Sequence, residues 1–149
     1  MTSQQTQAEE NKALTRRLFE EGVNQNNPSV FDELIAPDFV NHDAPPGIPR
    51  GPEGMRQLVA MFRTAFPDMR VTFEEELADG DSVIHRGYVT GTHQGDFQGI
   101  PPTAKQVKIK TIDIWRVANG KMVENWVQMD MLGMMQQLGV VPAPGQTGS

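Results

Sequence analysis

Residues 108–117, KIKTIDIWRV, form the clearest strand in the chain and are the starting point for the fold. The stretch is rich in isoleucine and ends in Trp-Arg-Val, a composition typical of a half-buried β-strand. Side chains alternate between the two faces of a strand, so one face carries Val107, Ile109, Thr111, Asp113, Trp115 and Val117. The opposite face carries Lys108, Lys110 and Arg116, with Ile112 and Ile114 between them. The less charged face is the better candidate for burial, and it holds the acid Asp113.

Length and composition describe one globular domain. The 149 residues are 38% hydrophobic and 21% charged, enough to bury a core within a single unit, 1–149, with order expected over about 9–139. The net charge of −6 argues against nucleic acid as a partner, because phosphate binding needs a concentrated basic face. The densest basic cluster, Lys105, Lys108 and Lys110, is better explained as a solvated strand edge.

Several features that would signal other classes of protein do not occur in the sequence. There are no cysteines, which excludes disulfides, thiolate metal sites and cysteine nucleophiles. The three histidines lack HxH or HxxxH spacing, so no metal site is expected. The beginning, MTSQQTQAEENK, has no apolar signal core, and no run reaches the roughly 18 apolar residues of a membrane span. We therefore expect a cytoplasmic protein without a membrane partner.

The first half of the chain has helical periodicity. After a polar, frayed beginning, an amphipathic helix is predicted by Ala13, Leu14, Leu18 and Val23. Asn27 is expected to cap a short helix, PSVFDELI, with Pro28 at its first position. Residues 38–54 are too rich in Pro and Gly for regular structure, except around Phe39 and Val40. A third helix, ended by Pro67, is predicted by Met55, Leu58, Val59, Phe62 and Phe66.

From residue 69 the apolar period changes to two. It predicts four strands, near 69–77, 83–92, 107–117 and 122–129, with hairpin turns at Asp79-Gly80-Asp81 and Asn119-Gly120. Asp130 is expected to cap a final helix, MLGMMQQL, ended by Gly139, and the tail 140–149 to be disordered. Glycines at 87, 91, 95 and 99 predict a bent sheet. The fold class is therefore α+β, with helices on one face of a curved sheet and Asp113 in the wall of the enclosed pocket.

The segments GTHQGDFQGIPPTAK, IDIWRVANGKMVENW and QQLG, with Asp130 and the upstream FVNHD, resemble the SnoaL-like polyketide cyclases. The resemblance covers about residues 11–139, and Ala104 stands where members commonly carry Gly. It implies the cone-shaped α+β fold shared with ketosteroid isomerase and nuclear transport factor, with about four mostly antiparallel strands, three N-terminal helices and a short C-terminal helix. It also implies cofactor-free ring closure by aldol chemistry, with an Asp as general base and acid; by motif position that residue is Asp113.

The chemistry gives Asp113 a role that agrees with this resemblance. Removing a proton next to a carbonyl group needs a base stronger than an ordinary aspartate, and a dry apolar site, here beside Trp115, strengthens a carboxylate as a base. The enolate then needs a hydrogen-bond donor or a fixed dipole. The alternative is that Asp113 is exposed, or pairs with a cation such as Arg86.

Other candidate site residues are two histidines and residues of the last strand. His93 could be a donor or proton shuttle at the pocket mouth, or a surface loop residue, and His42 has the same two readings. Trp126 could stack on a flat polycyclic ligand or pack in the core, and Gln128 could bind a carbonyl group. We expect a small apolar or polycyclic carbonyl compound as ligand, contacted by His42, Trp115, Trp126 and Gln128.

Alternative functions on this fold stay open. One is a binding module that holds a small apolar molecule without chemistry. A hydrolase would need a carboxylate network with Arg and Tyr or Asn, and an isomerase would need a Tyr donor; Arg86 and the single Tyr88 are the available residues. By analogy with the fold, we expect a homodimer or a higher homo-oligomer, with dimerisation through the sheet face that carries Ile112 and Ile114.

Overall fold

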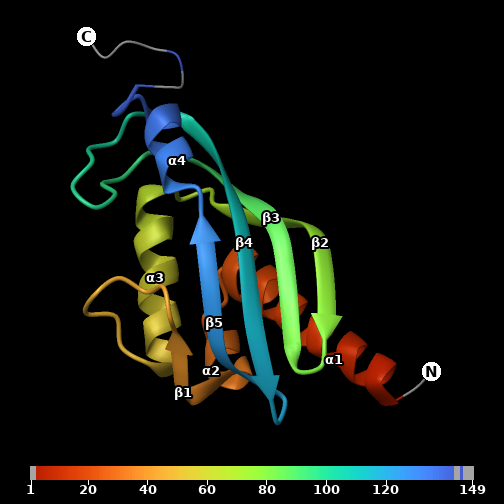
Figure 1. Ribbon diagram of the computed structural model, residues 1–149. Coiled ribbons are helices and arrows are strands. Elements are labelled where there is room, and N and C mark those ends of the chain that lie inside the picture. The colour runs from red at the N-terminus through yellow and green to blue at the C-terminus, as the bar shows by residue number, and fades with distance from the viewer. Residues whose placement is uncertain (1–2, 143–144, 146–149) are drawn as a thin grey trace.

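The computed structural model describes residues 3–142 and residue 145, and it has helices packed on a single five-stranded sheet (Figure 1). The helices are α1 (Ser3–Arg17), the π-helix η1 (Leu18–Asn24), α2 (Ser29–Leu34), α3 (Gly51–Ala65) and α4 (Met131–Leu138). The strands are β1 (Ile35–Asn41), β2 (Arg70–Asp79), β3 (Ser82–Thr92), β4 (Gln106–Ala118) and β5 (Lys121–Met129), in the order β1-β5-β4-β3-β2. The predicted α+β class is confirmed, with one strand more than expected. No helix in the described ranges is long and apolar enough to cross a membrane.

The additional strand is β1, which lies at the edge of the sheet and runs parallel to β5. It pairs Ile35 with Met122 and Val40 with Glu124, and its register shifts between these two pairs. Pro37 lies inside this irregular part, which agrees with the restriction of proline to edge strands and bulges. The prediction of regular structure only around Phe39 and Val40 was therefore too narrow. The proline and glycine residues of the following loop made strand β1 difficult to predict from sequence. Strand β1 forms because it can hydrogen-bond to the neighbouring strand β5.

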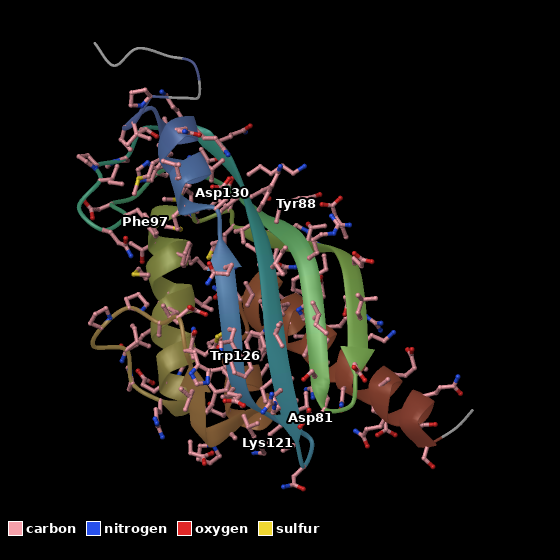
Figure 2. The ribbon with its side chains drawn as sticks, in the orientation of Figure 1. Asp81, Tyr88, Phe97, Lys121, Trp126 and Asp130 are labelled. Atoms are coloured by element: carbon pink, nitrogen blue, oxygen red, sulfur yellow. The ribbon has the colours of Figure 1, made fainter. Side chains whose placement is uncertain are left out.

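Helix ends follow the sequence signals at one site and depart from them at another. Asp130 lies at the beginning of α4 (Figure 2). It caps this helix as predicted, accepting a hydrogen bond from the Gly133 amide at 2.8 Å, and Gly139 ends the helix with φ of 80°. The predicted Asn27 cap is wrong, because Pro28 stands at the cap position of α2 without a side-chain bond. Helix α1 begins at Ser3, although order was expected only from about residue 9. Most of the tail predicted to be disordered, residues 143–144 and 146–149, lies outside the described residues.

The two faces of β4 differ in burial as its sequence predicted. Its inward side chains are all buried, and they are Val107, Ile109, Thr111, Asp113, Trp115 and Val117. On the opposite face Ile112 is 54% exposed and Ile114 is 37% exposed. Homodimerisation through that face stays a prediction.

Glycine permits close backbone approach at one of the irregular places in the sheet. Gly87 of β3 pairs with Phe73 of β2, beside the register shift between Phe73 and Glu75. A Cβ atom on Gly87 would lie 2.0 Å from the Thr72 carbonyl oxygen, so only glycine fits there.

Candidate active site

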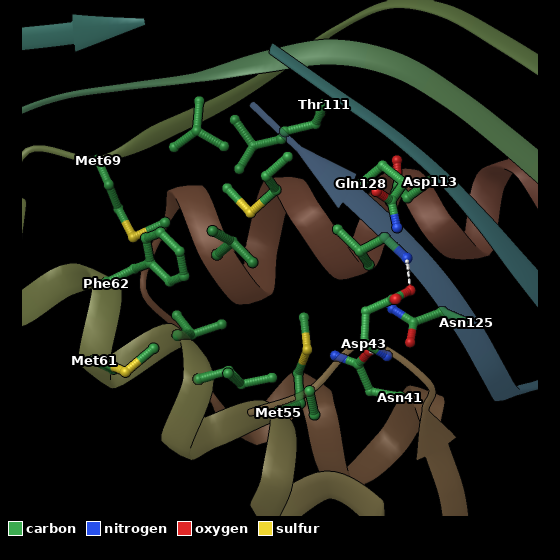
Figure 3. Close-up of a pocket in the computed structure, with 18 of the residues that line it drawn as sticks. Asn41, Asp43, Met55, Met61, Phe62, Met69, Thr111, Asp113, Asn125 and Gln128 are labelled. Carbon is green, nitrogen blue, oxygen red and sulfur yellow. Dashed lines mark hydrogen bonds between the residues drawn. The ribbon is translucent and has the colours of Figure 1, made fainter. Parts of the chain in front are cut away.

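A cavity of about 470 Å³ lies between the inner face of the sheet and helix α3. Its wall is polar at one end and apolar at the other (Figure 3). The polar end carries Asp113, Asn125, Asn41 and Asp43, and the apolar end carries Met61, Phe62 and Met69. A cavity of this size and character suits a small, largely apolar molecule with a few polar groups at one end.

Asp113 is the buried acid in this wall, with 5% of its surface exposed. Its Oδ2 atom accepts a hydrogen bond of 2.5 Å from the indole nitrogen of Trp115. Its Oδ1 atom is buried and has no hydrogen-bond partner among the described residues. The alternative position for Asp113 is wrong: the residue is not exposed, and Arg86 lies on the outer face, 3.3 Å from Glu75. Oδ2 is therefore hydrogen-bonded by Trp115, whereas Oδ1 has no hydrogen-bond partner among the described residues.

His85 stands beside Asp113, and sequence reasoning did not assign it to the site. The two residues are paired across β3 and β4, and His85 Nδ1 lies 3.6 Å from Asp113 Oδ2. The imidazole is completely buried and stacks on Phe73 with 4.0 Å between ring centroids. No local signal could identify this pair, because the register between β3 and β4 was not known from sequence.

Asn125 is the second site residue that the sequence did not identify. It lies opposite Trp115 in the β4–β5 pair, is 2% exposed, and its Oδ1 atom is buried without a hydrogen-bond partner among the described residues. Next to it, Asp43 accepts a hydrogen bond of 2.7 Å from the Val127 amide (Figure 3). The Asn41 side chain in turn accepts from the Asp43 amide at 2.9 Å. The loop after β1 is thereby tied to the cavity edge.

His93 is buried, and it is not among the residues that line the cavity. Its Nδ1 atom accepts a hydrogen bond of 3.2 Å from the Thr103 amide, and its carbonyl oxygen accepts one of 2.8 Å from the Ala104 amide. Neither predicted position, at the pocket mouth or on a surface loop, matches this one. In this structure His93 closes the base of the loop between β3 and β4.

Of the remaining predicted residues, two line the cavity and two do not. Trp115 and Gln128 line the cavity, Gln128 from an exposed position. His42 and Trp126 do not line it. Their rings stack on each other with 4.7 Å between centroids, and His42 Nε2 lies 2.8 Å from Glu124 Oε2. The structure therefore brings Asp113, Trp115 and Gln128 together, and places His42, His93 and Trp126 elsewhere.

This arrangement is suited to moving a proton within a largely apolar cavity. A buried carboxylate with one free oxygen can act as a general base or acid on a bound molecule. Among the described residues, no three His, Asp or Glu side chains are grouped so that they could hold a metal ion. The fold and site define a small α+β protein with a buried acid in the wall of a largely apolar cavity.

Comparison with known proteins gives the family. The sequence model of the SnoaL-like polyketide cyclases matches residues 13–138, and the chain belongs to this family. It is 30% identical over 119 residues to a nogalonic acid methyl ester cyclase of Streptomyces nogalater, covering 78% of this chain and 88% of the relative. It is 29% identical over 129 residues to the aklanonic acid methyl ester cyclase DnrD of Streptomyces peucetius, covering 85% of this chain and 88% of that one.

Solved structures agree with this assignment. Wild-type IdmH from Streptomyces antibioticus superposes with a TM-score of 0.75 at 35% identity, over 87% of this chain and 98% of the other. The expected family and fold are confirmed, and the likeness to named cyclases supports a SnoaL-like cyclase enzyme.

Proposed function

We propose that this protein is a cofactor-independent cyclase that closes a ring in a polyketide-like ester by intramolecular aldol addition, with Asp113 as general base and then general acid. The observation that carries the proposal is the free Oδ1 atom of Asp113, buried in the wall of an apolar cavity. The relatives named as methyl ester cyclases support the same reaction class.

The reaction needs no atom or electron from outside the substrate. Asp113 Oδ1 takes a proton from a carbon atom between two carbonyl groups, which leaves a delocalised enolate. The enolate carbon attacks a second carbonyl carbon of the same molecule, forming a carbon–carbon bond and an alkoxide. Asp113 returns its proton to the alkoxide, so the enzyme ends the cycle unchanged.

The cavity supports this chemistry at both of its ends. A dry site strengthens a carboxylate as a base, because burial disfavours its charged form. The Asn125 amide and the Thr111 hydroxyl group also line the cavity, and they are the candidate donors for the enolate oxygen. At the apolar end the flexible methionine side chains can adapt to a flat ring system.

Ring closure by the purified protein tests the proposal, with the methyl esters of nogalonic and aklanonic acid as substrates. Asp113→Asn keeps an oxygen acceptor for Trp115 but removes the base, so we expect turnover to fall by about 10²–10⁴-fold. Substrate deuterated at the acidic carbon should lose its label only with the wild-type protein. Asp79→Asn, at an exposed strand end, is the matched control.

Two results would contradict the proposal. A folded Asp113→Asn protein that retains full turnover would remove Asp113 from the mechanism. Tight binding of these esters by the wild type without any turnover would favour the alternative function, a binding module for small apolar molecules.

A further inference from the structure

A buried polar cluster lies beside Asp113, and the proposed mechanism does not use it. Its centre is His85, which has no exposed surface and does not line the cavity. Asp113, Thr15 and Glu76 are its polar neighbours, from strand β4, helix α1 and strand β2. These contacts determine where the imidazole carries its protons.

The contact with Thr15 places one proton on His85 Nε2. The Thr15 hydroxyl group donates its single hydrogen to the Lys12 carbonyl oxygen at 3.0 Å. Thr15 Oγ1, 3.1 Å from His85 Nε2, must therefore accept the hydrogen bond between them. In a neutral imidazole this would leave Nδ1 with a lone pair and no hydrogen.

The contact with Asp113 requires a second proton. Nδ1 and Asp113 Oδ2 are 3.6 Å apart, an ion-pair distance rather than a hydrogen bond, and Nδ1 has no hydrogen-bond partner among the described residues. A lone pair facing a carboxylate is repulsive, whereas an N–H group facing it is attractive. The pair is therefore favourable only when one proton lies between them.

The charged groups around His85 favour placing that proton on the imidazole. Glu76 Oε2 lies 3.6 Å from Nε2, so carboxyl groups face both ring nitrogens. Glu76 is also bound by a cation, since Arg16 donates to its other oxygen at 3.0 Å. The aromatic rings of Phe73 and Phe19 also pack against the imidazole, which has no exposed surface. Nearby opposite charges stabilise the charged imidazole, and they act strongly where water is absent.

We propose that His85 is a positioning residue that holds a proton against Oδ2 of Asp113 and so keeps the carboxyl group ionised, with Oδ1 free to act as the base. This inference rests on the proposed function, in which Asp113 is the base. Trp115 and His85 together neutralise and fix one oxygen, so the other can take the substrate proton. The cluster thus offsets the burial that would otherwise favour the uncharged acid.

Two substitutions of His85 separate this role from packing. His85→Asn keeps a side-chain N–H near the position of Nδ1 but cannot titrate, and His85→Phe keeps an aromatic ring on Phe73 without any donor. With His85→Phe we expect kcat to fall at least tenfold with little change in KM, and the acid limb of the pH–rate profile to move to higher pH. With His85→Asn we expect a smaller loss and an acid limb near that of the wild type. Equal losses in both variants, with an unshifted acid limb, would overturn the proposal.

Nitrogen-15 NMR of the three histidines shows which ring nitrogens of His85 carry a hydrogen, and it needs no substrate. At neutral pH we expect both ring nitrogens of His85 to be protonated in the wild type, and the hydrogen on Nδ1 to be lost in Asp113→Asn. The control Asp79→Asn should leave the His85 signals unchanged. A wild-type His85 ring with a hydrogen on one nitrogen only, or a ring whose signals Asp113→Asn leaves unchanged, would overturn the inference. A wild-type protein that shows the expected signals but no turnover would instead contradict the proposed function alone.

Discussion

Trp115 donates a hydrogen bond of 2.5 Å from its indole N–H group to Oδ2 of Asp113. The two residues are two positions apart on strand β4 and lie on the same face of it. Both side chains point inward because strand residues two apart share a face. The bond fixes the rotamer of Asp113, and it leaves Oδ1 as the free oxygen. A tryptophan that could be read as ordinary core packing therefore also orients the candidate base.

Trp115→Phe should weaken the enzyme more than it weakens the fold. The variant keeps most of the apolar contact but removes one donor to a charged group, worth about 1.5–3 kcal/mol. We expect kcat/KM for ring closure to fall by about 10–100-fold, with the acid limb of the pH profile moved upward. Trp126→Phe is the matched comparison, since Trp126 does not line the cavity and should lose far less activity. Similar losses in both variants would contradict this role of Trp115.

Asn125→Leu should raise the stability of the protein and lower its activity. Asn125 Oδ1 is buried without a hydrogen-bond partner among the described residues, and burying such an atom costs about 1–3 kcal/mol. Leucine has a similar shape and no polar atom, so we expect the free energy of unfolding to rise by about 1 kcal/mol. The KM for an ester substrate should rise if the amide binds it. Chemical denaturation and steady-state kinetics measure both effects, and a destabilised variant with unchanged KM would show that Asn125 is structural.

Ala104→Gly should stabilise the protein. Ala104 has φ of 62°, a left-handed conformation that costs a residue with a Cβ atom about 1–2 kcal/mol. Glycine removes this strain but has more freedom in the unfolded chain, so we expect a net gain of about 0.5–1 kcal/mol. Thermal unfolding should show a Tm rise of about 1–4 °C. Ala118→Gly is the control, because Ala118 has no positive φ and its replacement should lower Tm.

Asp68 should make stability depend on acid pH. Its carboxylate accepts hydrogen bonds from the Thr92 amide at 2.7 Å and the Thr92 hydroxyl group at 2.8 Å. The amide bond is the main cause that lowers the pKa of Asp68 below its ordinary value of 3.8. A lowered folded-state pKa gives stabilisation that is complete above the unfolded-state value and is lost as the pH falls through the folded-state value.

Asp68→Asn should therefore lower the free energy of unfolding by about 0.5–1 kcal/mol at neutral pH, a small effect because the group is exposed. The difference from wild type should shrink as the pH falls below 3.8. Denaturation curves at pH 7 and in the acid range measure this. A difference that stays constant over that range would show that the Asp68 charge is not involved.

Much of the site could be predicted from the local sequence, and the rest depended on strand register. Alternation along β4 placed Asp113 and Trp115 on the buried face, because period-two patterning needs no tertiary information. The Asn119-Gly120 turn also made β5 the neighbour of β4. His85 was different, since β3 and β4 are joined by the long segment 93–105 rather than a tight turn, and no local signal set their register.

The sequence by itself determined the order of helices and strands except for β1, the buried face of β4 and the family, because these follow from periodicity, turn residues and motifs within short windows. Only the tertiary structure decided that His85 faces Asp113, that Asn125 enters the cavity and that His93 does not. These placements depend on strand register and on how helix α1 packs against the sheet, so they involve residues far apart in the chain. The tertiary structure also leaves Oδ1 of Asp113 without a hydrogen-bond partner among the described residues, while Trp115 and His85 lie against Oδ2.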